Sequence, residues 1–279
     1  MSPAAPAVTF FLQGYAGKLF VLYVQPSQVT TTRRDVILVP PFAEEMNKSR
    51  HMLNRQAQAL ADMGIGVLMP DLYGTGDSEG DFAEARWSIW KHDIAAACAW
   101  LVEQGSRQIS LLGLRLGALL ALDFARSTQT PLERIILWQP VLNGTGMMTQ
   151  FLRQRLAASM LAGAEEKDST ENLRRILHSG QSIEVGGYDL APELQQVIDT
   201  LRIDALVESD SPPIHWLELV SQEGRTLTPA SQKIVQGWHA QGIGVNVIPV
   251  PGPAFWSSAE IVLAPSLLQE TARIFQEAA

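Results

Sequence analysis

Short apolar runs alternate regularly with longer amphipathic segments along this chain, and this pattern limits the folds open to it. Short apolar runs are typical of strands buried on both faces of a sheet, and apolar residues recurring every three or four positions are typical of helices packed on it. The alternation predicts an α/β fold with a mostly parallel, doubly wound sheet of about eight strands. The expected strands are Val8–Leu12, Lys18–Val24, Val36–Val39, Gly66–Met69, Ile109–Leu112, Arg134–Trp138, Ile214–Val220 and Val245–Val250.

The first two expected strands are separated by Gly14 and Gly17, which predicts an opening β-hairpin. Helices are expected where the amphipathic segments lie between the later strands. One of them is apolar nearly all round and is expected to be buried. The expected helices are Ser49–Met63, Ser88–Glu103, the buried Leu116–Arg126, Ser231–Ala240 and the closing Ser266–Glu277.

The alternation stops after Trp138. From Asn143 to Pro213 no clear buried strand is apparent, and a Gly186-Gly187 break interrupts a mainly helical pattern. Because the strand pattern resumes afterwards, we expect a helical cap over residues 143–211, inserted after the sixth strand into a core of residues 1–142 and 212–279. The helices expected in this cap are Thr149–Leu161, Thr170–His178 and Pro192–Asp204.

Composition excludes several classes of protein. The chain has 279 residues, with 21 Lys and Arg against 29 Asp and Glu, a formal net charge of −8. This acidic balance argues against a nucleic-acid partner, which would require a basic surface. A single cysteine, Cys98, excludes a disulfide framework and a cysteine-based zinc site, and we expect no metal and no cofactor. Without a signal-like N-terminus or a long uncharged apolar stretch, we expect no transmembrane segment and a cytoplasmic location.

The loop after the fifth expected strand has the layout of a nucleophile elbow. It reads Leu112-Gly113-Leu114-Arg115-Leu116-Gly117-Ala118, a strand followed by two glycines on either side of a central residue and then a helix. In such an elbow the central residue occupies a tight, strained turn, and the glycines leave room for it. This predicts a positive φ at Arg115. The alternative is that two small residues only allow a helix to pack closely on a strand.

A second turn makes the elbow interpretation more specific. After the fourth expected strand the chain reads Pro70-Asp71-Leu72-Tyr73-Gly74-Thr75-Gly76-Asp77-Ser78-Glu79-Gly80, and the third strand runs into Pro40-Pro41-Phe42-Ala43. In this order of segments the chain resembles the α/β-hydrolase superfamily. The resemblance implies the α/β-hydrolase fold, a structural role for Asp71 and Ser78, and an oxyanion loop at Pro40-Pro41-Phe42-Ala43.

The residues expected for hydrolase chemistry are replaced. Arg115 stands where the superfamily has its nucleophile, and a guanidinium has no lone pair for attack on a carbonyl. Phe255 or Trp256 stands where the resemblance implies the catalytic histidine, while Glu223 is a candidate for the acid. Proline has no N–H, so only the backbone N–H groups of Phe42 and Leu116 are left as oxyanion donors. The sequence therefore predicts a site without Ser-His-Asp catalysis.

Three segments carry a narrower resemblance. The run from Pro40 to Arg50, the elbow, and Pro251-Gly252-Pro253-Ala254-Phe255-Trp256 together resemble the second type of exosortase A system-associated hydrolase. This resemblance implies a protein encoded beside exopolysaccharide and protein-sorting genes in Gram-negative bacteria. It also implies exopolysaccharide-assembly proteins as partners, and it names no substrate.

A buried, unpaired guanidinium would be costly, so Arg115 is expected to meet a carboxylate, a ligand anion or water. Glu44, Glu45 and Glu223 are the candidate protein partners. A salt bridge that fills an inactive pocket and a clamp for an anionic sugar or acyl ligand are both open interpretations. The residues expected to line the ligand pocket are Phe42, Leu116, Gln139, Phe255 and Trp256.

Three functions remain open, and with them the question of whether the chain is an enzyme. The first is a pseudoenzyme that binds a small anionic or acylated ligand through Arg115. The second is an ester or thioester hydrolase in which Glu44, Glu45 or Glu223 activates a water while Arg115 polarises the substrate. The third is a non-catalytic subunit whose cap docks on a partner.

Overall fold

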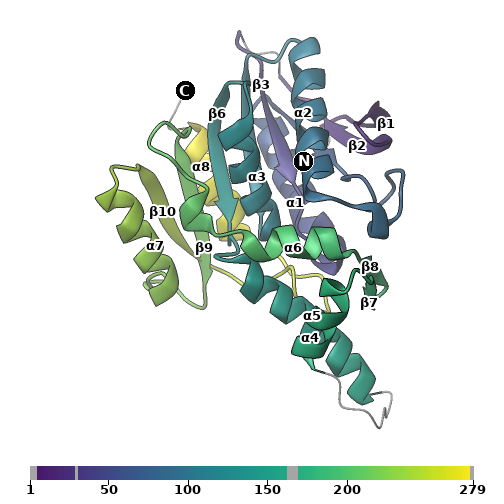
Figure 1. The fold of residues 1–279 in the computed structure, drawn as a ribbon. Coiled ribbons are helices and arrows are strands. Elements are labelled where there is room, and N and C mark those ends of the chain that lie inside the picture. Colours follow the sequence, from purple (N-terminus) through teal and green to yellow (C-terminus); the bar gives the residue numbers. More distant parts are fainter. Residues whose placement is uncertain (1–4, 29–30, 162–168, 277–279) are drawn as a thin grey trace.

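The computed structural model describes residues 5–28, 31–161 and 169–276. At its centre lies an eight-stranded sheet in the order β1-β2-β4-β3-β5-β6-β9-β10 (Figure 1). β1 and β2 form the expected antiparallel hairpin, β2 is also antiparallel to β4, and the remaining pairs are parallel. The strands are β1 Ala7–Gln13, β2 Lys18–Val24, β3 Arg34–Val39, β4 Ile65–Pro70, β5 Gln108–Leu114, β6 Leu132–Trp138, β9 Ile214–Val220 and β10 Val245–Pro251.

Helices cover both faces of this sheet, as the two-sided burial of its strands requires. One core contains buried residues of α2, α3 and α7, and the other contains those of α1 and α8. β5 shows why both faces need a cover, because every residue of this strand after Gln108 is buried. The doubly wound α/β fold predicted from the sequence is confirmed. The helices are α1 Glu44–Asp62, α2 Trp87–Glu103, α3 Leu116–Ser127, α7 Pro229–Ala240 and α8 Pro265–Gln276, with a short 3-10 helix η1 at Phe82–Glu84.

The chain between β6 and β9 forms the helical insertion that the sequence predicts (Figure 1). One expectation about it is wrong, because two short antiparallel strands pair within it. Their turn is Gly186-Gly187, where φ is 60° and 87°, a conformation that favours glycine. Strands of three residues are too short for a periodic pattern to reveal. The elements are α4 Gly144–Leu161, α5 Thr170–His178, β7 Ile183–Val185, β8 Tyr188–Leu190, α6 Pro192–Thr200 and the 3-10 helix η2 Ile203–Ala205.

Several helix ends differ from the expected ones. α1 begins at Glu44 and α4 at Gly144, each five residues earlier than the apolar periodicity suggests. The helix expected over Pro192–Asp204 ends at Thr200, because Leu201 is extended with ψ 132° and η2 follows separately. The last residue of the expected closing helix, Glu277, lies outside the described residues.

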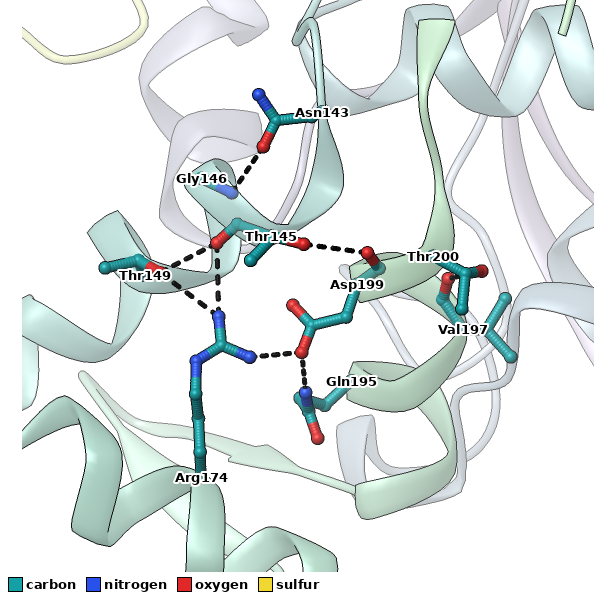
Figure 2. A network of polar contacts seen from close by, with 9 residues as sticks. All are labelled: Asn143, Thr145, Gly146, Thr149, Arg174, Gln195, Val197, Asp199 and Thr200. Carbon is teal, nitrogen blue, oxygen red and sulfur yellow. Dashed lines mark hydrogen bonds and ion pairs between the residues drawn. The ribbon is translucent and has the colours of Figure 1, made fainter. Parts of the chain in front are cut away.

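A polar network joins the three helices of the insertion (Figure 2). Arg174 of α5 forms an ion pair with Asp199 of α6, and its Nη2 donates to the backbone O of Thr145 and to Thr149 Oγ1 of α4, both at 3.1 Å. Gln195 donates to the same carboxylate of Asp199. Because one guanidinium satisfies acceptors on two other helices, the network fixes α4, α5 and α6 relative to one another.

The loop after β4 has the structural role that the resemblance implies. Asp71 accepts hydrogen bonds from the backbone N of Asp77 at 2.9 Å and from Arg50 at 3.0 Å. Ser78 Oγ donates to the backbone O of Asp71 at 2.6 Å and accepts from the N of Phe20 at 2.8 Å. Both side chains therefore hold the loop and the neighbouring strand β2 in place.

Asp93 of α2 provides a test of the fold energetics. Its side chain is fully buried, Oδ2 accepts a hydrogen bond from the N of Tyr73 at 2.9 Å, and Oδ1 has no partner among the described residues. Burial raises the pKa of Asp93 from 3.8 to about 6. The folded state thus holds this proton more tightly than the unfolded state, so stability falls as pH rises from about 4 to above 6.

We expect Asp93→Asn to raise the free energy of unfolding at pH 7 by up to about 3 kcal/mol, because an amide accepts the Tyr73 hydrogen bond without a charge. Urea unfolding at pH 4 and pH 7 measures the difference, which should be small at pH 4. The control Asp210→Asn removes an exposed carboxylate and should change stability by less than about 0.5 kcal/mol. Equal effects of Asp93→Asn at the two pH values would contradict the assignment.

Candidate functional site

The elbow between β5 and α3 places Arg115 at the carboxyl end of the sheet. Arg115 has φ 56° and ψ −116°, so the positive φ predicted from the two glycines is confirmed. A Cβ at Gly113 would lie 2.5 Å from Ala118 Cα, and one at Gly117 would lie 2.4 Å from the carbonyl oxygen of Pro40. The glycines are therefore required by close backbone contacts, and the chain keeps the geometry of a nucleophile elbow although its central residue is a cation.

The Arg115 side chain is held on one edge and one face. Its Nε donates to Glu45 Oε1 at 3.3 Å, and its guanidinium carbon lies 5.2 Å from the centroid of the Trp256 ring. The side chain is 16 % exposed, so most of it is buried. In the described part of the chain, no hydrogen bond involves its terminal nitrogens Nη1 and Nη2. Arg115 is positioned by the protein, and its two terminal nitrogens are left for another acceptor.

Glu45 lies in the first turn of α1 and is the protein partner of Arg115. Burial raises the pKa of Glu45, while Arg115 and then Lys48 act in the opposite direction. Its second oxygen, Oε2, is buried and has no hydrogen-bond partner within the described ranges. The carboxylate therefore neutralises Arg115 only in part, and at a cost in desolvation.

Glu44 points to a different neighbour. It is exposed, and its Oε2 accepts hydrogen bonds from Asn47 Nδ2 at 3.2 Å and from the hydroxyl of Tyr188 at 3.4 Å. Burial, and then the charge of Glu44, raise the pKa of Tyr188. Because Tyr188 belongs to β8, this contact joins the insertion to α1.

A cavity of about 380 Å³ opens between α1, the elbow and α4; we call it the Glu45 cavity. Its acidic residues, Glu44 and Glu45, are matched by Lys48 and Arg115, and α4 adds the amides of Gln150 and Gln154. This volume lies in the range of small-molecule sites. Phe42 and Trp256 supply its aromatic lining.

A second cavity of about 300 Å³ adjoins the first, and we call it the Glu218 cavity. The two share Arg115, Met147 and Gln150. Its other polar lining residues are Gln139, Asn143, Glu218, Thr228 and Ser231. Arg115 therefore borders two cavities of similar size.

The structure brings together only some of the expected pocket residues. Phe42 and Trp256 line the Glu45 cavity, and Gln139 lines the Glu218 cavity. Leu116 instead borders a void of about 20 Å³ between the elbow and Pro40-Pro41. Phe255 is buried in the core against Trp138 and Trp256. The void is large enough for about one water molecule, so the region expected to form an oxyanion site is nearly filled.

The expectation that Glu223 faces Arg115 is not met. Glu223 is exposed in the loop after β9 and lines neither the Glu45 cavity nor the Glu218 cavity. The acidic residue of this region that borders a cavity with Arg115 is Glu218, which is buried inside β9. A lone acidic residue within an apolar strand was the sequence signal that could have identified it.

All five histidines lie within the described residues, and none of them lines the Glu45 cavity or the Glu218 cavity. The one lining serine of the Glu45 cavity, Ser257, donates its hydroxyl to the backbone O of Ala254 at 3.1 Å. Within the described ranges, no three His, Cys, Asp or Glu side chains converge as metal ligands do, and no helix is both long and apolar enough to cross a membrane.

The sheet order, the elbow and the inserted helices define an α/β-hydrolase-fold protein. The chain matches the family described as serine aminopeptidase, S33, over residues 30–235, which is more than half of its length, and it belongs to this family. The family's description names a serine peptidase, whereas the central residue of this elbow is Arg115. A comparison with curated protein sequences finds no match.

Solved structures with the same fold cover nearly the whole chain. Est1E from Butyrivibrio proteoclasticus, solved with bound ferulic acid, is 16 % identical with a TM-score of 0.66 over 96 % of this chain and 98 % of that one. Proline iminopeptidase from Mycobacterium smegmatis is 14 % identical, with a TM-score of 0.62 over 97 % and 98 %. An α/β serine hydrolase homologue from Coxiella burnetii is 15 % identical, with a TM-score of 0.56 over 97 % and 96 %. At these identities the likeness shows the fold alone.

Proposed function

We propose that this protein binds a small anionic or acylated molecule through Arg115, beneath a cap formed by residues 143–211, and that it does so without Ser-His-Asp catalysis. One observation carries the proposal: the mostly buried Arg115 side chain occupies the elbow, and both of its terminal nitrogens lack a protein partner among the described residues. A bidentate carboxylate, phosphate or sulfonate is the ligand that such a fork recognises best.

The energetics favour an external anion over Glu45 alone. Glu45 reaches only Nε of Arg115, at 3.3 Å, and it carries a raised pKa because it is itself buried. A ligand anion on Nη1 and Nη2 would complete the neutralisation of a cation that remains charged at every physiological pH. The guanidinium of Arg115 also lies over the Trp256 ring. This contact orients its terminal nitrogens before a ligand binds.

The biological setting is also part of this proposal. Resemblance of three segments to the second type of exosortase A system-associated hydrolase supports a role in exopolysaccharide or protein-sorting systems, with their assembly proteins as partners. A cytoplasmic location is a separate part of the proposal. Under this proposal Arg115 belongs to the ordinary site of such proteins. The role of the protein in such a system is then to recognise an anion through Arg115.

Two measurements test the proposal. Calorimetric titration should show that hexanoate binds and that hexan-1-ol, which has the same chain without the charge, does not. A fluorophosphonate probe should leave every serine unlabelled, because no imidazole borders the Glu45 cavity or the Glu218 cavity to activate one. Equal binding of the alcohol, or labelling at any serine, would refute the proposal.

The pairing of Glu45 with Arg115 predicts competition with the ligand. We expect Glu45→Gln to tighten the binding of hexanesulfonate about tenfold, because the variant removes the internal anion and leaves Arg115 to the external one. Hexanesulfonate stays ionised, so its affinity for the wild type should also rise as pH falls toward the raised pKa of Glu45, and this pH dependence should vanish in Glu45→Gln.

The other charged groups at the cavity are Glu44, Lys48 and Arg115. The control Glu44→Gln removes a neighbouring charge that does not pair with Arg115, and its sulfonate affinity should retain the pH dependence. Weaker binding by Glu45→Gln would contradict the competition.

A second function is favoured by one feature of Glu45. A partly buried carboxylate with a raised pKa and a buried, unpartnered oxygen is suited to activate a water, with Arg115 polarising an ester or thioester carbonyl. Hydrolysis of acyl esters and acyl thioesters by the wild type and Glu45→Gln separates the two functions. Turnover that is lost in Glu45→Gln would establish the hydrolase, while absence of turnover in both supports the binding protein.

A further inference from the structure

Three side chains of the Glu218 cavity share one arrangement. Gln139 Oε1 accepts a hydrogen bond from the N of Leu219 at 2.7 Å, Asn143 Oδ1 accepts from the N of Gly146 at 2.7 Å, and Glu218 Oε1 accepts from the N of Thr228 at 2.8 Å. Each side chain is therefore fixed to the backbone through one oxygen, and its second polar atom is left to contact a ligand. No protein hydrogen bond involves Gln139 Nε2, Asn143 Nδ2 or Glu218 Oε2 in the described part of the chain.

The three side chains come from separate parts of the chain and meet beside Arg115. Gln139 follows β6, Asn143 precedes α4, and Glu218 lies in β9. Figure 2 shows Asn143 with its oxygen toward Gly146 and its amide nitrogen turned away. Gln139 also has φ 43°, a strained conformation for a residue other than glycine, and such strain persists where the surrounding structure enforces it.

We propose that the Glu218 cavity binds the hydroxyl groups of a ligand whose anionic group is held by Arg115. The ligand class is then an acidic sugar of the hexuronic acid type, and a simple acyl anion fits less well. This inference rests on the proposed function and adds the part of the ligand that Arg115 does not contact.

The chemistry of the three free atoms supports a sugar. The two amides present donors and Glu218 presents an acceptor, and a sugar hydroxyl can both donate and accept. An alkyl chain in the same cavity would remove water from the buried carboxylate of Glu218 and return no hydrogen bond, which is unfavourable. A hydroxylated ring keeps these groups satisfied, and their backbone anchors mean that little ordering is required on binding.

The test compares two monoanions, glucuronate and hexanoate, by calorimetric titration of the wild type and Glu218→Gln. The variant keeps an oxygen for the N of Thr228 and turns the free acceptor into a donor. We expect glucuronate to bind the wild type more tightly than hexanoate, and the ratio of the two affinities to fall about tenfold in Glu218→Gln. Because both ligands carry one negative charge, the lost charge of Glu218 changes both affinities alike and cancels in the ratio.

A second pair of variants keeps the test informative if Glu218→Gln does not fold. Gln139→Glu retains an oxygen that accepts from the N of Leu219, and it replaces the free amide donor with a carboxylate oxygen. The control Gln154→Glu adds the same charge at a residue that lines the Glu45 cavity and not the Glu218 cavity. Only Gln139→Glu should lower the ratio of glucuronate to hexanoate affinity. The sugar assignment is overturned if the wild type does not prefer glucuronate, or if the affinity ratio is unchanged in both Glu218→Gln and Gln139→Glu. In either case, binding of hexanoate would still support the proposed function. If neither anion binds the wild type, the proposed function fails and this inference fails with it.

Discussion

Replacement of Gly117 by alanine is expected to lower the free energy of unfolding by at least about 2 kcal/mol. The added Cβ would lie 2.4 Å from the carbonyl oxygens of both Val39 and Pro40, which are backbone atoms at the end of β3. These atoms can give way only if the strand end or the elbow shifts. The same shift would displace Arg115, so anion binding should weaken with stability.

The chain offers a matched control in Gly237. This glycine lies within α7, and an added Cβ there would meet nothing within 4 Å. Gly237→Ala should therefore stabilise the protein by about 0.5–1 kcal/mol through helix propensity alone. Urea denaturation followed by tryptophan fluorescence measures both variants. If Gly117→Ala matched Gly237→Ala, the close packing at the elbow would be wrong.

Replacement of Arg115 by glutamine is expected to weaken hexanoate binding at least about 100-fold. Two charge-assisted hydrogen bonds to one carboxylate would be lost, and each is worth about 1.5–3 kcal/mol. The substitution also leaves Glu45 without its cation in a site where the Glu45 side chain is only 25 % exposed. Some loss of stability is therefore expected as well. Calorimetric titration gives the affinity, and thermal melting shows whether the variant is folded.

Much of the fold follows from the sequence because strands buried on both faces must be apolar runs. β5 and β6 are of this kind, and both were expected within three residues of their observed ends. The start of α1 was missed because its first turn, from Glu44, is polar and carries no apolar period. Acidic residues in a first helical turn are favoured by the helix dipole, and Glu44-Glu45 was the available signal.

The site was predictable only where strand ends fix it. Arg115 and Glu45 meet because the elbow and the loop after β3 lie at the same end of neighbouring parallel strands. The direction of a long loop has no such constraint, which is why Glu223 was expected in the site and lies outside it. Trp256 lines the Glu45 cavity as expected, and the guanidinium of Arg115 lies over its ring, a contact that the sequence pattern does not predict.

The most direct test of an anion clamp at the elbow is the Kd of hexanesulfonate for the double variant Arg115→Gln/Glu45→Gln, measured beside Glu45→Gln. The double variant leaves no unpaired carboxylate in place of the salt bridge, so its fold should be retained and its binding should report on Arg115 alone. We predict tighter binding than wild type for Glu45→Gln and no detectable binding for the folded double variant. A double variant that binds hexanesulfonate as tightly as Glu45→Gln would contradict the role of Arg115.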